Sequence, residues 1–267
     1  MKRLYAKIVL GAVRPRPDEL PDRELTRTVE VDRRALAAYD RVCGFRLRDE
    51  LPATYPHVLA FPLAMELMAS GDFPFSPLGL VHVANRIEQL RPIGAGERLD
   101  LRVWADGLAP HERGRQFELH GEATVDGDVV WRDVSTYLHR EGGGSSSSKR
   151  DGAEPPEPSA VWRVPGDIGR RYARVSGDAN PIHLHPLTAK ALGQPGAIAH
   201  GMWTKARCLA ALEGELPAAY AVDVRFKVPL RIPGRAAFSF RDGEFAVHDA
   251  RTCKPCATGR VSRVTGG

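Results

Sequence analysis

The 267-residue sequence predicts an α+β fold in which two similar halves each wrap an antiparallel sheet around one buried helix. First, an apolar segment with helical spacing precedes several strand-like segments, and this order occurs twice. Second, the two copies align without gaps at an offset of 139 residues, which pairs Arg86 with Arg225 and Ile93 with Ile232. Third, a polar linker separates them. Side-by-side pairing of the two sheets would give one continuous antiparallel layer.

The first half, residues 1–140, is expected to contain one long buried helix and a run of strands. Its opening residues, 1–49, predict one or two strands with loops and a short helix over 33–42. Residues 58–70 are apolar at helical spacing and end at Gly71, so we expect a buried helix there. The remaining segments, several with period-two alternation, are predicted as strands. They span residues 80–90, 98–104, 115–124 and 129–139.

Residues 141–158 form the predicted linker. Their Gly-Gly-Gly-Ser-Ser-Ser-Ser and Pro-Pro-Glu-Pro runs cannot contribute to a core, and no Gly-Lys-Ser/Thr follows the glycines, which argues against a phosphate-binding loop. The second half, residues 159–267, repeats the plan with a helix over 199–213 that ends at Gly214. Strands are predicted after it. They span residues 219–230, 235–240, 244–248 and 257–264.

The composition excludes several classes of protein. A hydrophobic content of 43% with 27% charged residues is typical of a soluble globular protein, and no apolar run is long enough for a membrane span. Residues 1–10 lack a signal-peptide pattern, so we expect a cytoplasmic location. The net charge of +5 is spread along the chain without an aromatic-interleaved basic stripe, which argues against nucleic acid as a partner. Such a diffuse positive surface suits a phosphate-bearing ligand or an acidic carrier protein.

Four cysteines in a chain of this size do not form a disulfide framework. Cys253 and Cys256 make a lone CxxC with no second pair, so an incidental thiol pair is favoured over a zinc site.

Residues 172–189 carry the densest set of chemically active side chains. Asp178, Asn180 and His183 fall within six positions, on a segment stiffened by prolines and opened by Gly177. A carboxylate and an imidazole held on a stiff loop can act as an acid/base pair at one reacting atom. Taken alone, Asp-x-Asn-Pro is also a common turn.

The pattern Tyr-x-x-Val-Ser-Gly-Asp-x-Asn-Pro-Ile-His, which starts at Tyr172, resembles the hydration motif of the MaoC-like, (R)-specific enoyl-thioester hydratases and dehydratases. Residues 198–202, Ile-Ala-His-Gly-Met, resemble the segment that opens the central helix in that family. The resemblance implies a double hot-dog fold, in which each half is a long helix wrapped by a curved antiparallel sheet. In such double hot dogs only one half keeps the motif.

The resemblance also implies an activity: reversible dehydration of (R)-3-hydroxyacyl thioesters to trans-2-enoyl thioesters in fatty-acid metabolism, with neither metal nor redox cofactor. Asp178 and His183 would be the catalytic pair and would hold one water, which attacks C3 while a proton goes to C2. The backbone N–H of Gly201 would stabilise the developing enolate. Asn180 and Ser176 complete the expected oxyanion and substrate-binding positions, and we expect the Asn180 amide to brace the loop.

The sequence departs from the family's pattern at His185 and Gln194. The first alters a helix cap before Pro186, and the second lies near the expected pocket, so it bears on acyl-chain preference. The first half has no Asp-x-Asn-Pro-x-His, and Asp40 and His57 lie too far apart to recreate it by spacing. We therefore expect that half to shape the acyl tunnel without catalysing.

Several alternatives remain open at this stage. His183, His185 and His200 could form a metal cluster, although the prolines argue against a shared strand face. On the same scaffold the protein could be a thioesterase, a specialised short-chain enoyl-CoA hydratase, or a non-catalytic acyl-thioester-binding subunit. The acyl carrier could be coenzyme A or acyl carrier protein, and the chain could form a homodimer.

Overall fold

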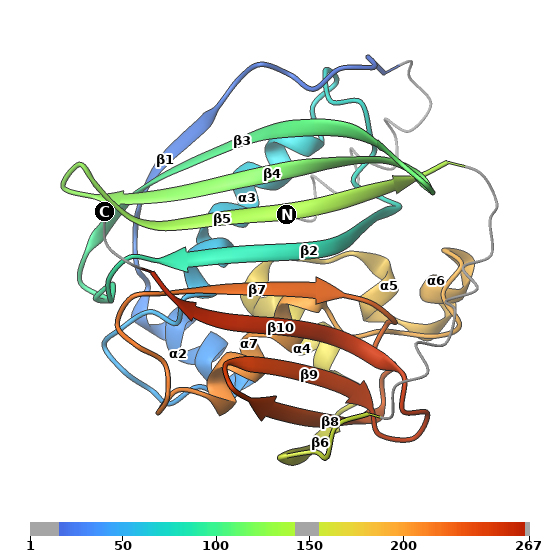
Figure 1. The fold of residues 1–267 in the computed structure, drawn as a ribbon. Helices are drawn as coiled ribbons and strands as arrows, with labels where there is room; N and C mark the ends of the chain where they lie inside the picture. The colour runs from blue at the N-terminus through green and yellow to red at the C-terminus, as the bar shows by residue number, and fades with distance from the viewer. Residues whose placement is uncertain (1–15, 142–154, 265–267) are drawn as a thin grey trace.

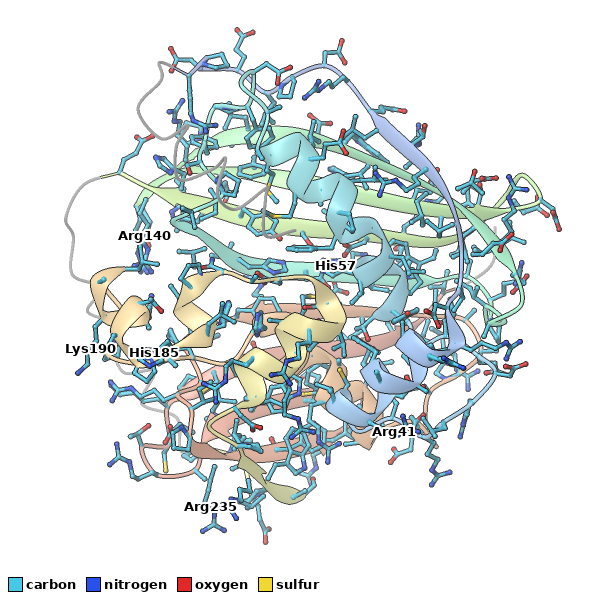
Figure 2. The ribbon with its side chains drawn as sticks, turned by 180° about the vertical axis from the view of Figure 1, so that it is seen from behind. Arg41, His57, Arg140, His185, Lys190 and Arg235 are labelled. Carbon is cyan, nitrogen blue, oxygen red and sulfur yellow. The ribbon has the colours of Figure 1, made fainter. Side chains whose placement is uncertain are left out.

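The computed structural model describes residues 16–141 and 155–264, which form one ten-stranded antiparallel sheet covered on one face by helices (Figures 1 and 2). The strand order is β1-β3-β4-β5-β2-β7-β10-β9-β8-β6. The first five of these strands come from the N-terminal half of the chain and the last five from the C-terminal half. The two sheets therefore pair side by side into one layer, as the sequence predicted.

The described part of the N-terminal half contains two helices and five strands. They are β1 (Leu25–Glu30), α2 (Arg33–Cys43), α3 (Tyr55–Met68), β2 (Leu80–Gln89), β3 (Arg98–His111), β4 (Gly114–Val125) and β5 (Asp128–Arg140). The C-terminal half begins with a strand, β6 (Ala160–Val164), and continues with four helices and four more strands. They are α4 (Ile168–Ser176), α5 (Pro181–Leu184), α6 (Pro186–Ala191), α7 (Gly201–Ala211), β7 (Tyr220–Phe226), β8 (Gly234–Arg241), β9 (Glu244–Asp249) and β10 (Pro255–Arg263).

The two predicted apolar helices are α3 and α7, and each lies against the inner, helix-covered face of the sheet. Ten of the fourteen residues of α3 are buried, and its apolar side chains surround the axis, which is the pattern of a helix enclosed by a core. In the strands the burial alternates with period two, most clearly in β4, because one face packs on the helices while the other faces outward. None of the described helices is long and apolar enough to cross a membrane.

Five elements differ from the sequence-based prediction. The helices α4 and α5 and the strand β6 were not predicted, β3 runs to His111, and β7 ends at Phe226. The sequence did predict the start of α6, since the Nδ1 atom of His185 accepts a hydrogen bond from the N–H of Leu187 and caps that helix. Most of the predicted linker, residues 142–154, lies outside the described residues.

The two halves join where β2 pairs with β7, at the centre of the sheet (Figure 1). Lys205 of α7 is fully buried behind this seam, where its Nζ atom donates to the backbone oxygen of Asn85 at 3.2 Å, to its Oδ1 at 2.5 Å and to the backbone oxygen of Val222 at 3.0 Å. Three acceptors match the three N–H groups of a protonated amine. One lysine therefore fastens α7 to both central strands.

Helices of the two halves also contact each other. The indole N–H of Trp203 in α7 donates to the backbone oxygen of Val42 in α2 at 3.1 Å. Tyr39 of α2 lies 6.2 Å, between ring centroids, from Tyr172 of α4. Both tyrosines are buried, so α4 is held against the N-terminal half as well as its own.

Gly169 in α4 allows this helix to approach the segment that follows it. A Cβ atom at Gly169 would lie 1.9 Å from the backbone oxygen of His183 in α5. Because a backbone atom cannot move aside as a flexible side chain does, only glycine fits at this position.

We expect Gly169→Ala to lower the free energy of unfolding by about 1–3 kcal/mol, since α4 and α5 would have to separate. Urea unfolding followed by circular dichroism measures this change. The matched control is Gly196→Ala, where an added Cβ meets no atom within 4 Å. Equal stability of the two variants would contradict the close packing of α4 on α5.

Candidate active site

The loop between α4 and α5 is built from its own backbone and side-chain hydrogen bonds. The helix α4 ends at Gly177, which has a left-handed φ of 78° and whose N–H bonds to the backbone oxygen of Ala173. Asn180 then caps α5 through its Oδ1 atom, which accepts from the N–H of Ile182 at 3.3 Å. The N–H of Asn180 donates to Oδ1 of Asp178 at 3.1 Å. The carboxylate of Asp178 is therefore oriented by a residue two positions away.

Ser176 completes this local network. Its hydroxyl donates to the backbone oxygen of Tyr172 at 2.9 Å and accepts from the N–H of Asp178 at 3.2 Å. The Ser176 hydroxyl and the backbone N–H of Asn180 thus both bond to Asp178, whereas the side-chain oxygen of Asn180 caps α5.

His183 is buried in α5, and its hydrogen bond assigns the position of its proton. Its Nδ1 atom lies 2.9 Å from the backbone oxygen of Ile198, and a carbonyl oxygen can only accept. The proton therefore sits on Nδ1, and Nε2 keeps its lone pair in the neutral ring. Burial lowers the pKa of His183 below its ordinary 6.5, although the charge of Asp178 and the bond to Ile198 act in the opposite direction. At neutral pH this imidazole is a free base.

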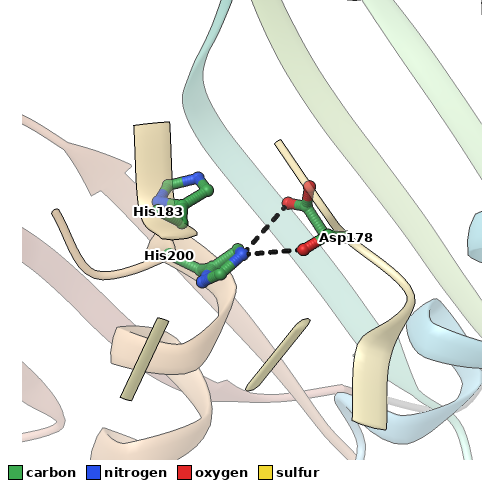
Figure 3. A group of neighbouring side chains, drawn as sticks. All are labelled: Asp178, His183 and His200. Carbon is green, nitrogen blue, oxygen red and sulfur yellow. Dashed lines mark hydrogen bonds and ion pairs between the residues drawn. The ribbon is translucent and has the colours of Figure 1, made fainter. Parts of the chain in front are cut away.

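His200, the residue before α7, joins the same cluster (Figure 3). Its Nε2 atom lies 3.1 Å from the backbone oxygen of Asp178 and 3.7 Å from the carboxylate atom Oδ2. Its ring stacks on that of His183 with 3.6 Å between centroids. Burial, reinforced by the neighbouring His183, lowers the pKa of His200 to about 3, so its ring is neutral.

The sequence placed His200 only in a hypothetical metal cluster and missed its place beside Asp178. Its position directly before Gly201 could have indicated this, because the backbone of the residue that precedes a helix is held in place by the first turn of that helix. The Nδ1 atom of His200 is buried and has no hydrogen-bond partner among the described residues.

Gly201 is the first residue of α7. The first N–H groups of a helix have no partner inside it and carry partial positive charge, so this end of α7 can stabilise a developing anion. A Cβ atom on Gly201 would lie 3.0 Å from the ring of Phe226, which means that a side chain here would have to displace that ring. Glycine at this position therefore lets the Phe226 ring pack against the start of α7.

The structure tests the metal hypothesis through its donor atoms. His185 is exposed and caps α6, so it does not join His183 and His200. One ligand atom each from Asp178, His183 and His200 lie within 4.8 Å of one another. However, Nε2 of His200 donates to a carbonyl and must hold a proton, whereas a metal ion needs a deprotonated nitrogen. The remaining lone pair on Nε2 of His183, beside a carboxylate, suits proton transfer better.

In the N-terminal half, Asp40 and His57 do not form a second pair of this kind. Asp40 is buried in α2, where burial and the charge of Glu213 raise its pKa to about 7. His57 lies in α3 and bonds through Nδ1 to Oδ2 of Asp133 at 2.7 Å. This histidine–aspartate pair joins residues 76 positions apart, so no local motif could reveal it.

Comparison with known proteins identifies related chains. Residues 153–256 match the family model described as a MaoC like domain. The 3-hydroxyacyl-thioester dehydratase X of Mycobacterium tuberculosis is 39% identical over 235 residues, which cover 86% of this chain and 84% of that protein.

Solved structures agree with the described fold. A crystal structure of HtdX from Mycobacterium tuberculosis superimposes with a TM-score of 0.80 at 37% identity, covering 90% of this chain and 100% of the other. Another Mycobacterium tuberculosis protein, with a double hot-dog fold, superimposes with a TM-score of 0.56 at 12% identity, covering 92% of this chain and 97% of the other. The double hot-dog prediction is therefore confirmed.

The buried neutral state of His200 predicts acid sensitivity. An imidazole with a lowered pKa takes up a proton on unfolding, so its stabilising contribution is complete above pH 6.5 and is lost as the pH falls toward 3. Between pH 6.5 and pH 5 we expect His200 to account for a loss of about 1.5 kcal/mol, which His200→Gln should remove.

Urea unfolding at both pH values measures this loss. His185→Gln, which replaces an exposed histidine, is the control and should retain the loss shown by the wild type. If His200→Gln lost as much stability in acid as the wild type, His200 would not be buried in its neutral form.

Proposed function

The chain belongs to the MaoC-like family of 3-hydroxyacyl-thioester dehydratases, and from this premise we propose that Asp178 and His183 catalyse its reaction. The protein is a hydro-lyase that interconverts 3-hydroxyacyl and trans-2-enoyl thioesters in fatty-acid metabolism. The observation that carries the assignment of the pair is the hydrogen bond from Nδ1 of His183 to Ile198, which leaves Nε2 with a free lone pair on a ring that clusters with the Asp178 carboxylate.

In the hydration direction, Asp178 and His183 hold one water between them. Nε2 of His183 takes a proton from this water while its oxygen bonds to C3, and the imidazolium then delivers that proton to C2. Asp178 accepts the second hydrogen bond from the water and stabilises the transient positive charge on the imidazole. In dehydration each step reverses, with His183 taking the C2 proton and giving it to the leaving hydroxyl. Both groups return to their starting states.

The negative charge that develops on the thioester oxygen during either direction needs a donor. We assign this role to the backbone N–H of Gly201, supported by its position at the start of α7 and by the absence of a side chain there. His200, stacked on His183 and bonded to the backbone of Asp178, keeps the two catalytic groups at a fixed separation.

The carrier of the acyl group is coenzyme A or acyl carrier protein in this proposal, which the net charge of +5 supports because both carriers are acidic. The (R) configuration of the 3-hydroxyacyl product follows from the resemblance of the motif and belongs to the same proposal. A homodimer and a cytoplasmic location stay predictions from the sequence.

Asp178→Asn and His183→Gln should each lower kcat for hydration of crotonyl-CoA by about a hundredfold or more, because each removes a group that holds or moves the proton. Loss of the enoyl chromophore measures the rate, and circular dichroism checks the fold. His185→Gln is the matched control and should keep the wild-type rate. Near-native rates in both site variants would exclude this pair, and binding of crotonyl-CoA without turnover by the wild type would favour the non-catalytic binding subunit.

The pH dependence of kcat/KM should report the ionisation of His183. Because burial holds the pKa of His183 below 6.5, the ring is neutral and active at pH 7 and loses its lone pair only at lower pH. We expect kcat/KM to be level from pH 6.5 to pH 8 and to fall on acidification with a midpoint below 6.5. A midpoint above 7 would show that His183 is not the base.

A further inference from the structure

The inner face of β5 carries a row of polar side chains where a helix-covered sheet is ordinarily apolar. With the period of two that defines one face of a strand, the row consists of Asp133, Ser135, Tyr137 and His139. On the neighbouring strand β2, His82 lies opposite Tyr137 and Asn85 lies opposite Ser135. A buried polar group is costly unless it is hydrogen-bonded, so each member of this row needs a partner.

Asp133 and Ser135 of this row are satisfied by a network that joins four elements. Asp133 accepts from His57 of α3 and from the amide of Asn85, and that amide also donates to the hydroxyl of Ser135 at 2.9 Å. Asn85 accepts in turn from Lys205 of α7. Burial alone would raise the pKa of Asp133, but His57 beside it holds that pKa below its ordinary value. The Asp133 carboxylate is thus an ionised and fully bonded centre.

His82 of β2, which lies opposite Tyr137, is not satisfied in this way. Its ring is stacked on Tyr137 at 4.6 Å and is nearly parallel to His57 at 6.5 Å, so neighbours on two sides fix its plane (Figure 2 labels His57). Yet its Nε2 atom is buried and has no hydrogen-bond partner among the described residues. Burial, with His57 acting in the same direction, lowers the pKa of His82 to about 3, so the ring is neutral. A neutral imidazole nitrogen held in place without a partner is prepared for a ligand group.

The position of His82 connects it to the catalytic centre. Its ring lies 5.0 Å from the ring of Phe226, and Phe226 is the side chain that closes over Gly201. The charge of Asp178 reaches both His82 and Tyr137, where it acts to raise the pKa of each. An acyl chain whose thioester oxygen bound at Gly201 would have to pass Phe226 to reach His82 in the N-terminal half.

We propose that His82 recognises a hydroxyl group carried by the acyl chain beyond C4, so that the preferred substrates are hydroxylated rather than plain alkyl thioesters. This inference rests on the proposed function only for the placement of the thioester at Gly201. A hydroxyl group both donates and accepts, so it pairs with Nε2 of His82 in either tautomer. A plain alkyl chain leaves that nitrogen buried and unpaired, which costs binding free energy.

Isothermal titration with saturated acyl-CoA molecules, which cannot be dehydrated, tests the preference without requiring turnover. The probes are octanoyl-CoA and its isomers with one hydroxyl group at successive carbons beyond C4. We expect at least one isomer to bind the wild type about tenfold more tightly than octanoyl-CoA, as a matched polar pair discriminates against its apolar analogue. His82→Phe should abolish this preference, and His82→Gln, which keeps a donor and an acceptor, should retain most of it.

The control is His120→Phe, which replaces a histidine stacked on Trp104 of β3, and it should leave the preference unchanged. Equal affinity of the wild type for octanoyl-CoA and for every hydroxylated isomer would overturn the proposal, and so would a preference that survives His82→Phe.

Hydration of crotonyl-CoA, whose chain has no carbon beyond C4, is measured in parallel with the wild-type protein. A protein that prefers a hydroxylated acyl-CoA but does not hydrate crotonyl-CoA would refute the proposed function and leave the recognition by His82 standing. A protein that hydrates crotonyl-CoA but shows no preference for a hydroxylated acyl-CoA would refute the recognition by His82 and leave the proposed function standing.

Discussion

The buried contact of Lys205 with Asn85 and Val222 is the constraint on which the rest of the structure depends. A lysine amine enclosed by the fold must find acceptors for its N–H groups, and it finds them on β2 and β7, the strands through which the two halves meet. Lys205 lies one helical turn after Gly201 on α7. Fastening this lysine therefore sets the position of the helix end at which we place the thioester, and the catalytic half cannot be positioned without the other half.

The sequence predicted most of the fold, and the part of the site that local chemistry determines. The apolar helices α3 and α7 and the strands that follow them have clear periodicity because each packs one side against the same core. Asp178 lies in a short loop whose bonds connect residues two to four positions apart, and His183 follows five positions later in α5, so a motif covers both residues. Such a loop folds in the same way wherever its residues occur.

The remaining part of the site depends on contacts between distant residues, which no local pattern encodes. His200 meets Asp178 across 22 positions, and His57 meets Asp133 across 76. The helix α4 spans only nine residues and was missed although Ile168, Tyr172 and Ser176 recur on its buried face at helical spacing, and its place is set by Gly169 packing on α5. In these cases tertiary packing, and not propensity, determines the structure.

The polar inner row of β5 explains why the half without the motif is not a passive copy. A half retained only to complete the sheet would fill this face with apolar side chains, as β4 does with Phe117 and Leu119. Instead it buries Asp133 and Asn85 in a network that reaches α7, and leaves one nitrogen of His82 unpaired beside Phe226. Buried polar groups that weaken a core are expected where function requires them. In our proposals the two halves contribute different parts of one site, with the C-terminal half moving the proton and the N-terminal half contacting the acyl chain.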